Sequence, residues 1–241
     1  MKINVHAGHN PDGKVACGAV GLIKESTEAR KVKNEVIRQL KALGHTVYDC
    51  TIDDGTSQSN VLTRIVQKCN AHKVDLDVSI HFNSGANDKS GDGKTTGTEV
   101  YIYSDKSGAT LEAKRTCEAI ASLGFKNRGV KTSKSLYVLK KTASPAMLIE
   151  CCFVDDKDDV KHYDYLSMAS AIAYGITGQT YADKADSVED TEASKAGAET
   201  ATGISKTTYR VQVGAYTIKS NAKELQARLK KAGFDSIIVK S

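Results

Sequence analysis

The chain has 241 residues, of which 40% are hydrophobic and 26% are charged, and this length predicts one large domain with a smaller appendage. The composition excludes a chain that is disordered throughout. The sequence has no run of about 18 apolar residues, so we predict no membrane-spanning helix. The formal net charge of +5 favours anionic polymers, but the positive residues are dispersed and accompany no nucleic-acid-binding motif, so we predict no nucleic-acid partner.

Short apolar segments alternate with amphipathic segments up to about residue 178. This pattern predicts an α/β domain with a mostly parallel twisted sheet flanked by helices. We expect no signal peptide, because His6 interrupts the first apolar segment, and therefore synthesis in the cytoplasm. Six segments are predicted strands: 3–6, 45–49, 75–81, 99–103, 136–139 and 146–150. Four are predicted helices: 28–43, 59–71, 109–123 and about 160–176.

Three further segments define the predicted domain organisation. Residues 85–96, rich in glycine, lysine and serine, are expected to form a long flexible loop between two strands. Residues 179–206 contain few large apolar groups and are predicted to be a flexible linker between the domain at 1–178 and a small module at 207–241. The module has a strand, helix, strand pattern of about 35 residues, which is too short for a domain that is stable on its own.

The six cysteines contain no CxxC pair and no dense spacing, so we expect reduced thiols rather than disulfides. Cys151 and Cys152 are adjacent in a predicted strand, so their side chains point to opposite faces and do not share one metal.

Two histidines stand at the carboxyl ends of predicted strands. His9 follows the first strand and His81 ends the third. Ligands of open α/β sheets bind at this edge. Each histidine taken alone is more often structural, but the pair at one edge is informative.

Glu25 precedes the first predicted helix, where a carboxylate also serves to complement the helix dipole. Together with His9 and His81 it gives two imidazoles and one carboxylate, a set typical of catalytic zinc because a fourth position stays open for water. One zinc ion at such a site lowers the pKa of its water and polarises a carbonyl.

Glu150 ends a predicted apolar strand, where another hydrophobic residue is expected. Burial of a carboxyl costs free energy, so a buried acid in a strand suggests a functional role. A carboxylate beside activated water can take its proton and deliver it to a leaving amine. The alternative is a strand-end acid in solvent.

Five blocks of the sequence, at residues 7–9, 21–25, 79–83, 127–130 and 145–150, carry a resemblance to a known family. Through them the chain resembles, over residues 1–178, the zinc-dependent N-acetylmuramoyl-L-alanine amidases of autolysins and phage endolysins. The resemblance implies that His9, Glu25 and His81 bind zinc, that Glu150 is the catalytic acid/base, and that peptidoglycan is cut between N-acetylmuramic acid and L-alanine. His6-Ala7 and Cys151-Cys152 depart from the family pattern.

Two proposed ligands have a rival three residues away: His6 for His9, and Glu28 for Glu25. The family context, with Gly8 before the histidine and Ile-Lys before the glutamate, favours His9 and Glu25.

Residues 209–216 and 222–225 resemble the first half of a SPOR domain, a module that binds peptidoglycan. One half exposes an unpaired sheet edge. The hypothesis is that two chains pair their halves in a homodimer. No membrane insertion is expected.

The leading hypothesis is therefore a muramoyl-alanine amidase, an endolysin or autolysin that reaches the wall after release through a holin or on lysis. The alternatives are a zinc peptidase acting within the stem peptide and a non-catalytic wall-binding adaptor.

Overall fold

The computed structural model describes residues 1–180, 223, 226, 237 and 238. The chain divides into two units, Met1–Lys195 and Ala196–Ser241. The predicted linker and the module at 207–241 lie almost wholly outside the described residues, so the fold below is that of residues 1–180.

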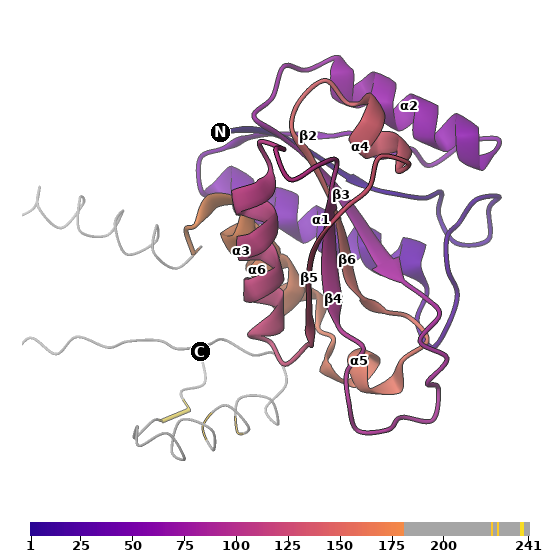
Figure 1. The fold of residues 1–241 in the computed structure, drawn as a ribbon, viewed down its shortest axis with the longest axis vertical. Coiled ribbons are helices and arrows are strands. Elements are labelled where there is room, and N and C mark those ends of the chain that lie inside the picture. Colours follow the sequence, from indigo (N-terminus) through magenta and orange to yellow (C-terminus); the bar gives the residue numbers. More distant parts are fainter. Residues whose placement is uncertain (181–222, 224–225, 227–236, 239–241) are drawn as a thin grey trace, which may run out of the picture. The chain divides into compact units, whose positions relative to one another are not determined.

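A six-stranded sheet in the order β2-β1-β3-β6-β4-β5 forms the centre of this unit (Figure 1). Its neighbours are parallel except for the antiparallel pair β4 and β6. The predicted α/β fold with a mostly parallel sheet is confirmed. The strands are β1 (Lys2–Ala7), β2 (Thr46–Asp49), β3 (Leu76–Asn83), β4 (Thr98–Ile102), β5 (Asn127–Thr132) and β6 (Ala146–Phe153).

Helices cover both faces of the sheet, and each face has its own apolar cluster. On one face Val32, Ile120 and Ile172 bring α1, α3 and α6 onto the sheet. On the other face Ile65 and Val138 bring α2 and α4 onto it. The helices are α1 (Glu25–Ala42), α2 (Gln58–Asn70), α3 (Thr110–Ala121), α4 (Tyr137–Lys141), α5 (Lys157–His162) and α6 (Tyr165–Thr177). Among the described residues, no helix is both long and apolar enough to cross a membrane.

Two predicted elements differ from the structure, and one strand of the structure was not predicted. Residues 136–139, predicted as a strand, lie in and next to the short helix α4, whose Val138 and Leu139 are buried; a short apolar run fits either state. The edge strand β5 was not predicted, because its half-buried sequence lacks an apolar run. The predicted helix 160–176 is two helices, since Asp164 accepts a hydrogen bond from the Ser167 amide and begins α6.

Two strands continue past the residues predicted to end them. β3 runs on from His81 to Asn83, and β6 runs on from Glu150 to Phe153 because the residues after Glu150 are buried. Glu150 is therefore inside a strand and is not a solvent-facing strand end. The six cysteines form no disulfide, and the adjacent Cys151 and Cys152 are both buried.

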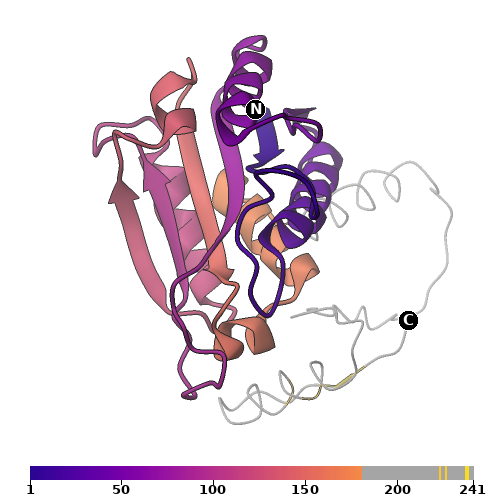
Figure 2. The same cartoon turned by 90° about the vertical axis from the view of Figure 1, so that its right-hand side faces the viewer.

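The long connection from β1 to α1 runs along the sheet toward the end of β6, as Figure 2 shows for this indigo segment. The amide of Leu22 donates to the carbonyl of Val154 at 2.7 Å. This connection therefore brings the start of α1 against the end of β3 and β6.

Candidate metal centre

His9, Glu25 and His81 converge on one point at this end of the sheet. His9 follows β1, Glu25 is the first residue of α1, and His81 lies in β3. Glu25 Oε1 lies 3.2 Å from His9 Nε2 and 3.0 Å from His81 Nδ1. One ligand atom from each residue lies within 4.8 Å of the others. The three residues singled out in the sequence are thus brought together.

Glu25 is held as a carboxylate in a buried position. Its side chain is 5% exposed. Burial alone would raise the pKa of Glu25, but hydrogen bonds from His81 and His9 outweigh burial and hold it well below its usual range. Two nitrogens and one carboxylate oxygen are the donor set that zinc takes in catalytic sites. The residues present therefore fit a zinc ion.

Glycines allow the backbone to approach the three side chains closely. A Cβ atom at Gly8 would lie 1.8 Å from His81 Cε1, and one at Gly18 would lie 2.5 Å from Glu25 Oε2. Gly18 also has a φ of +78°, which side-chain-bearing residues rarely adopt. Larger residues at these positions would displace the imidazole or the carboxylate.

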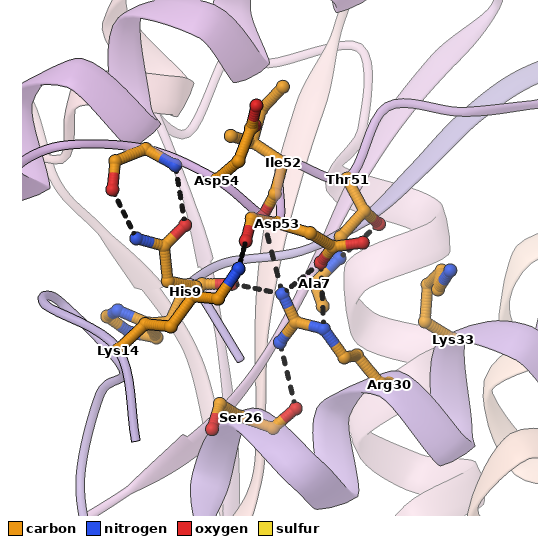
Figure 3. Close-up of polar contacts among 12 residues, drawn as sticks. Ala7, His9, Lys14, Ser26, Arg30, Lys33, Thr51, Ile52, Asp53 and Asp54 are labelled. Carbon is orange, nitrogen blue, oxygen red and sulfur yellow. Dashed lines mark hydrogen bonds and ion pairs between the residues drawn. The ribbon is translucent and has the colours of Figure 1, made fainter. Parts of the chain in front are cut away.

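Arg30 fixes the segment that carries His9 (Figure 3). Its Nη2 donates to the carbonyl of His9 at 2.6 Å and to Asp53 Oδ1 at 2.6 Å, and its Nη1 donates to the carbonyl of Ser26. One guanidinium therefore ties the β1–α1 connection to the β2–α2 connection and to α1. Sequence reasoning missed Arg30, since its partners are mainly backbone carbonyls without a sequence signature.

Glu150 lies beside the three converging residues. It pairs with His81 in the register of β6 and β3, and its Oε2 is buried with no hydrogen-bond partner among the described residues. Burial, with the charges of Glu25 and Glu99 added, raises the pKa of Glu150 to about 8. A carboxyl that exchanges its proton near neutrality suits general acid–base chemistry.

The rival residues lie elsewhere. His6 is inside β1 and 1% exposed, and burial, followed by the charge of His81, lowers its pKa to about 3. Glu28 pairs with Lys31 at 2.8 Å and accepts a hydrogen bond from the Tyr163 hydroxyl at 3.0 Å. Neither joins the three converging residues.

The histidines assigned no role have ordinary packing contacts. The ring of His72 stacks on Tyr48 with 3.8 Å between centroids, and His162 meets Phe125 edge-on. His45 Nδ1 lies 3.1 Å from the N-terminal nitrogen.

A second charged group beside Glu150 was also missed. Glu99 of β4 is directly opposite Glu150 in β6. Its carboxylate accepts hydrogen bonds from Arg128 Nε at 2.6 Å and from Lys131 Nζ. Arg128 lies in one of the five resemblance blocks, which was the available signal.

Comparison with known proteins covers nearly the whole chain. The model of the family described as N-acetylmuramoyl-L-alanine amidase matches residues 3–179, and that of the SPOR domain matches residues 191–240. The SPOR match begins inside the predicted linker 179–206, and the boundaries drawn at 178 and 206 stay predictions.

Individual relatives agree with the first match. An uncharacterized protein of Clostridium perfringens is 38% identical over 68% of this chain and 47% of its own length. The sporulation-specific N-acetylmuramoyl-L-alanine amidase of Bacillus subtilis is 32% identical over 69% of this chain and 57% of its own length. The chain thus spans about half the length of the curated relatives it matches.

One solved structure shows the same fold. The catalytic domain of an endolysin targeting Clostridia difficile superposes with a TM-score of 0.65 at 26% identity, covering 75% of this chain and 98% of that domain.

Proposed function

The chain belongs to the N-acetylmuramoyl-L-alanine amidase family, and from this premise we propose that it hydrolyses the amide bond between N-acetylmuramic acid and L-alanine in peptidoglycan. The observation that carries the proposal is the convergence of His9, Glu25 and His81 next to the buried carboxyl of Glu150. Family membership indicates the substrate class, and these four residues supply groups for amide hydrolysis.

His9, Glu25 and His81 would hold one zinc ion. When bound, zinc supplies Lewis acidity, which polarises a carbonyl and lowers the pKa of water. The three protein groups lie close enough together for this, since Glu25 contacts both imidazoles. Glu25 Oε2 also accepts a hydrogen bond from the Ala19 amide at 2.7 Å, which fixes its orientation.

Glu150 would move the protons of the reaction. A neighbouring cation lowers the pKa of a carboxyl, so a zinc ion held by these three residues would lower the pKa of Glu150 from about 8. Glu150 would then accept a proton from the attacking water and deliver it to the amine that leaves with the peptide. Its unpartnered Oε2 is the atom available for this transfer.

Mass spectrometry of digested peptidoglycan tests the proposal. The zinc-loaded chain should release stem peptides that begin with L-alanine and leave muramic acid with a free lactyl carboxylate. A zinc peptidase would instead create new amino groups within the stem peptide, and a non-catalytic wall-binding adaptor would release no product. Either result would overturn the amidase proposal.

We further propose that the SPOR-matching segment, residues 191–240, binds peptidoglycan and holds the catalytic unit on its substrate. The pairing of two such segments in a homodimer remains part of this proposal. It concerns residues that lie almost wholly outside those the structure describes.

A further inference from the structure

A line of charged side chains crosses the sheet from the candidate metal centre to its edge. His81 of β3, Glu150 of β6 and Glu99 of β4 are successive register partners. Directly opposite residues on neighbouring strands place their Cβ atoms about 5 Å apart on one face. Glu99 therefore lies beyond Glu150 as seen from His81, and Arg128 and Lys131 of β5 contact it from the far side.

Glu99 is a buried anchor for two cations. It is 2% exposed and also accepts hydrogen bonds from Tyr101 at 2.9 Å and Asn83 at 3.0 Å. By contrast, the side chains of Arg128 and Lys131 are 29% and 37% exposed. One carboxylate thus fixes the position of two cations that solvent can reach. Glu99, Arg128 and Lys131 together carry a net charge of +1.

Two nitrogens of the Arg128 guanidinium are available to donate hydrogen bonds to a ligand. Only its Nε donates to Glu99, and its Nη1 and Nη2 have no hydrogen-bond partner within residues 1–180. The guanidinium carbon lies 5.0 Å from the centre of the Phe153 ring, which restricts its orientation. A solvated surface ion pair would not need a buried acid and an aromatic ring to hold it. Two parallel N–H donors are the geometry that a carboxylate accepts.

The role proposed for Glu150 decides which part of the substrate reaches these cations. Glu150 delivers its proton to the leaving amine, so the amine side of the scissile bond lies next to Glu150. The acyl side lies toward His9, Glu25 and His81. Groups beyond Glu150 in this line, namely Arg128 and Lys131, therefore face the peptide that begins with L-alanine.

We propose that Arg128 and Lys131 form a subsite that binds a carboxylate of the stem peptide. The proposal rests on the proposed amidase function. Arg128 contributes its two terminal nitrogens, Lys131 adds a second positive charge, and Glu99 is a positioning residue that fixes both. The subsite selects peptides whose residue after L-alanine carries a free carboxylate over peptides in which it is a carboxamide.

A matched pair of substrates tests this selectivity. N-acetylmuramoyl-L-alanyl-D-glutamate carries free carboxylates, and its diamide carries carboxamides of nearly the same size. For the wild-type zinc enzyme, kcat/KM for the acid should exceed that for the diamide by about tenfold or more, as expected for a charge-assisted contact. In Arg128→Gln the ratio should fall toward one, and Arg128→Lys should keep part of it. Lys134→Gln removes an exposed positive charge just after β5 and should keep the wild-type ratio.

Binding of the same two ligands to zinc-loaded Glu150→Gln, measured by calorimetry, separates this proposal from the amidase proposal. Acid-selective binding that Arg128→Gln abolishes supports the subsite, even if the wild type cleaves neither ligand. Cleavage of both ligands at equal rates, or a preference that survives in Arg128→Gln, would overturn the subsite and leave the amidase proposal standing. Absence of both binding and cleavage would overturn both.

Discussion

Two acids in the first turn of α1 have different partners, although the sequence offers both as metal ligands. Glu25 and Glu28 are three residues apart, and spacing alone leaves both as ligand candidates. In the structure, Glu25 turns to His9 and His81, whereas Glu28 is taken by Lys31 and Tyr163. Tyr163 comes from the distant connection between α5 and α6, so no local pattern could have identified its contact.

Paired substitutions at these two positions test the ligand assignment. Glu25→Gln should weaken zinc binding by about 100-fold or more, because loss of an outer partner alone costs 10–100-fold. Glu28→Gln should keep the zinc affinity of the wild type. Zinc bound per chain, measured by atomic emission in a buffer of fixed free zinc, gives the comparison. The reverse order of the two affinities would assign the ligand to Glu28.

The connection between β3 and β4 is hydrogen-bonded to carboxylates near α5. Residues 85–96 were predicted to be flexible, but carboxylates from the region of α5 hold both ends. Asp155 accepts hydrogen bonds from the amides of Gly85, Ala86 and Asn87. Asp156 accepts from Thr96, and Asp159 accepts from Gly97. Backbone amides, the donors here, have no sequence signature, so these contacts could not be predicted, and the flexibility of the loop stays a prediction.

Removal of the Asp155 carboxylate should release the first of these ends. Hydrogen bonds to charged groups contribute about 1.5–3 kcal/mol each, so Asp155→Ala should lower the local opening free energy by at least that amount. Hydrogen exchange at the amides of residues 85–87 should speed up by about tenfold or more. Asp105→Ala, at an exposed acid in another connection, is the matched control. Unchanged exchange in Asp155→Ala would show that the loop is held by other contacts.

Asp156 should make the stability of this region dependent on pH. Burial raises its pKa, but hydrogen bonds from Thr96, Asp158 and Asp159 outweigh burial and lower it below 3.8. A lowered folded-state pKa means that its stabilisation is present above pH 3.8 and is lost as the pH falls through the folded-state value.

The variant Asp156→Ala provides the measurement. Its free energy of unfolding at pH 7 should be lower by about 2 kcal/mol, because it loses the N-cap of α5 and the hydrogen bonds to Thr96. The difference from wild type in the free energy of unfolding, measured with urea, should narrow as the pH falls below 3.8. A difference that stays constant over this range would contradict the lowered pKa.

Prediction of the elements succeeded where apolar periodicity is strong and failed where tertiary contacts decide. β1, β3 and α2 lie within two residues of their predicted bounds because their buried residues repeat at the period of a strand or a helix. β5 is polar on its exposed side, and α4 is too short to show a helical period. Because β5 was not predicted, Arg128 and Lys131, which contact Glu99 from this strand, were not singled out from the sequence.

At the scale of the whole molecule, the candidate site draws on distant parts of residues 1–180. Its four central residues come from the β1–α1 connection, α1, β3 and β6. His9, His81 and Glu150 were singled out at the ends of predicted strands and Glu25 before a predicted helix, but their shared location required the crossovers of the sheet.

The proposed pairing of two C-terminal segments predicts a dimer in solution. If two segments pair as proposed, light scattering at working concentration should give twice the chain mass of 25.9 kDa. A protein that stays strictly monomeric would contradict the pairing without affecting the catalytic site.

The most direct test of the central claim compares wild type with Glu150→Gln for zinc content and for release of L-alanine-initiated peptides from purified peptidoglycan. Glutamine keeps the shape of Glu150 but carries no exchangeable acidic proton, so the variant should bind one zinc per chain like the wild type. Its rate of peptide release should fall by about 100-fold or more. Release at the wild-type rate by zinc-loaded Glu150→Gln would remove Glu150 from the reaction and contradict the mechanism.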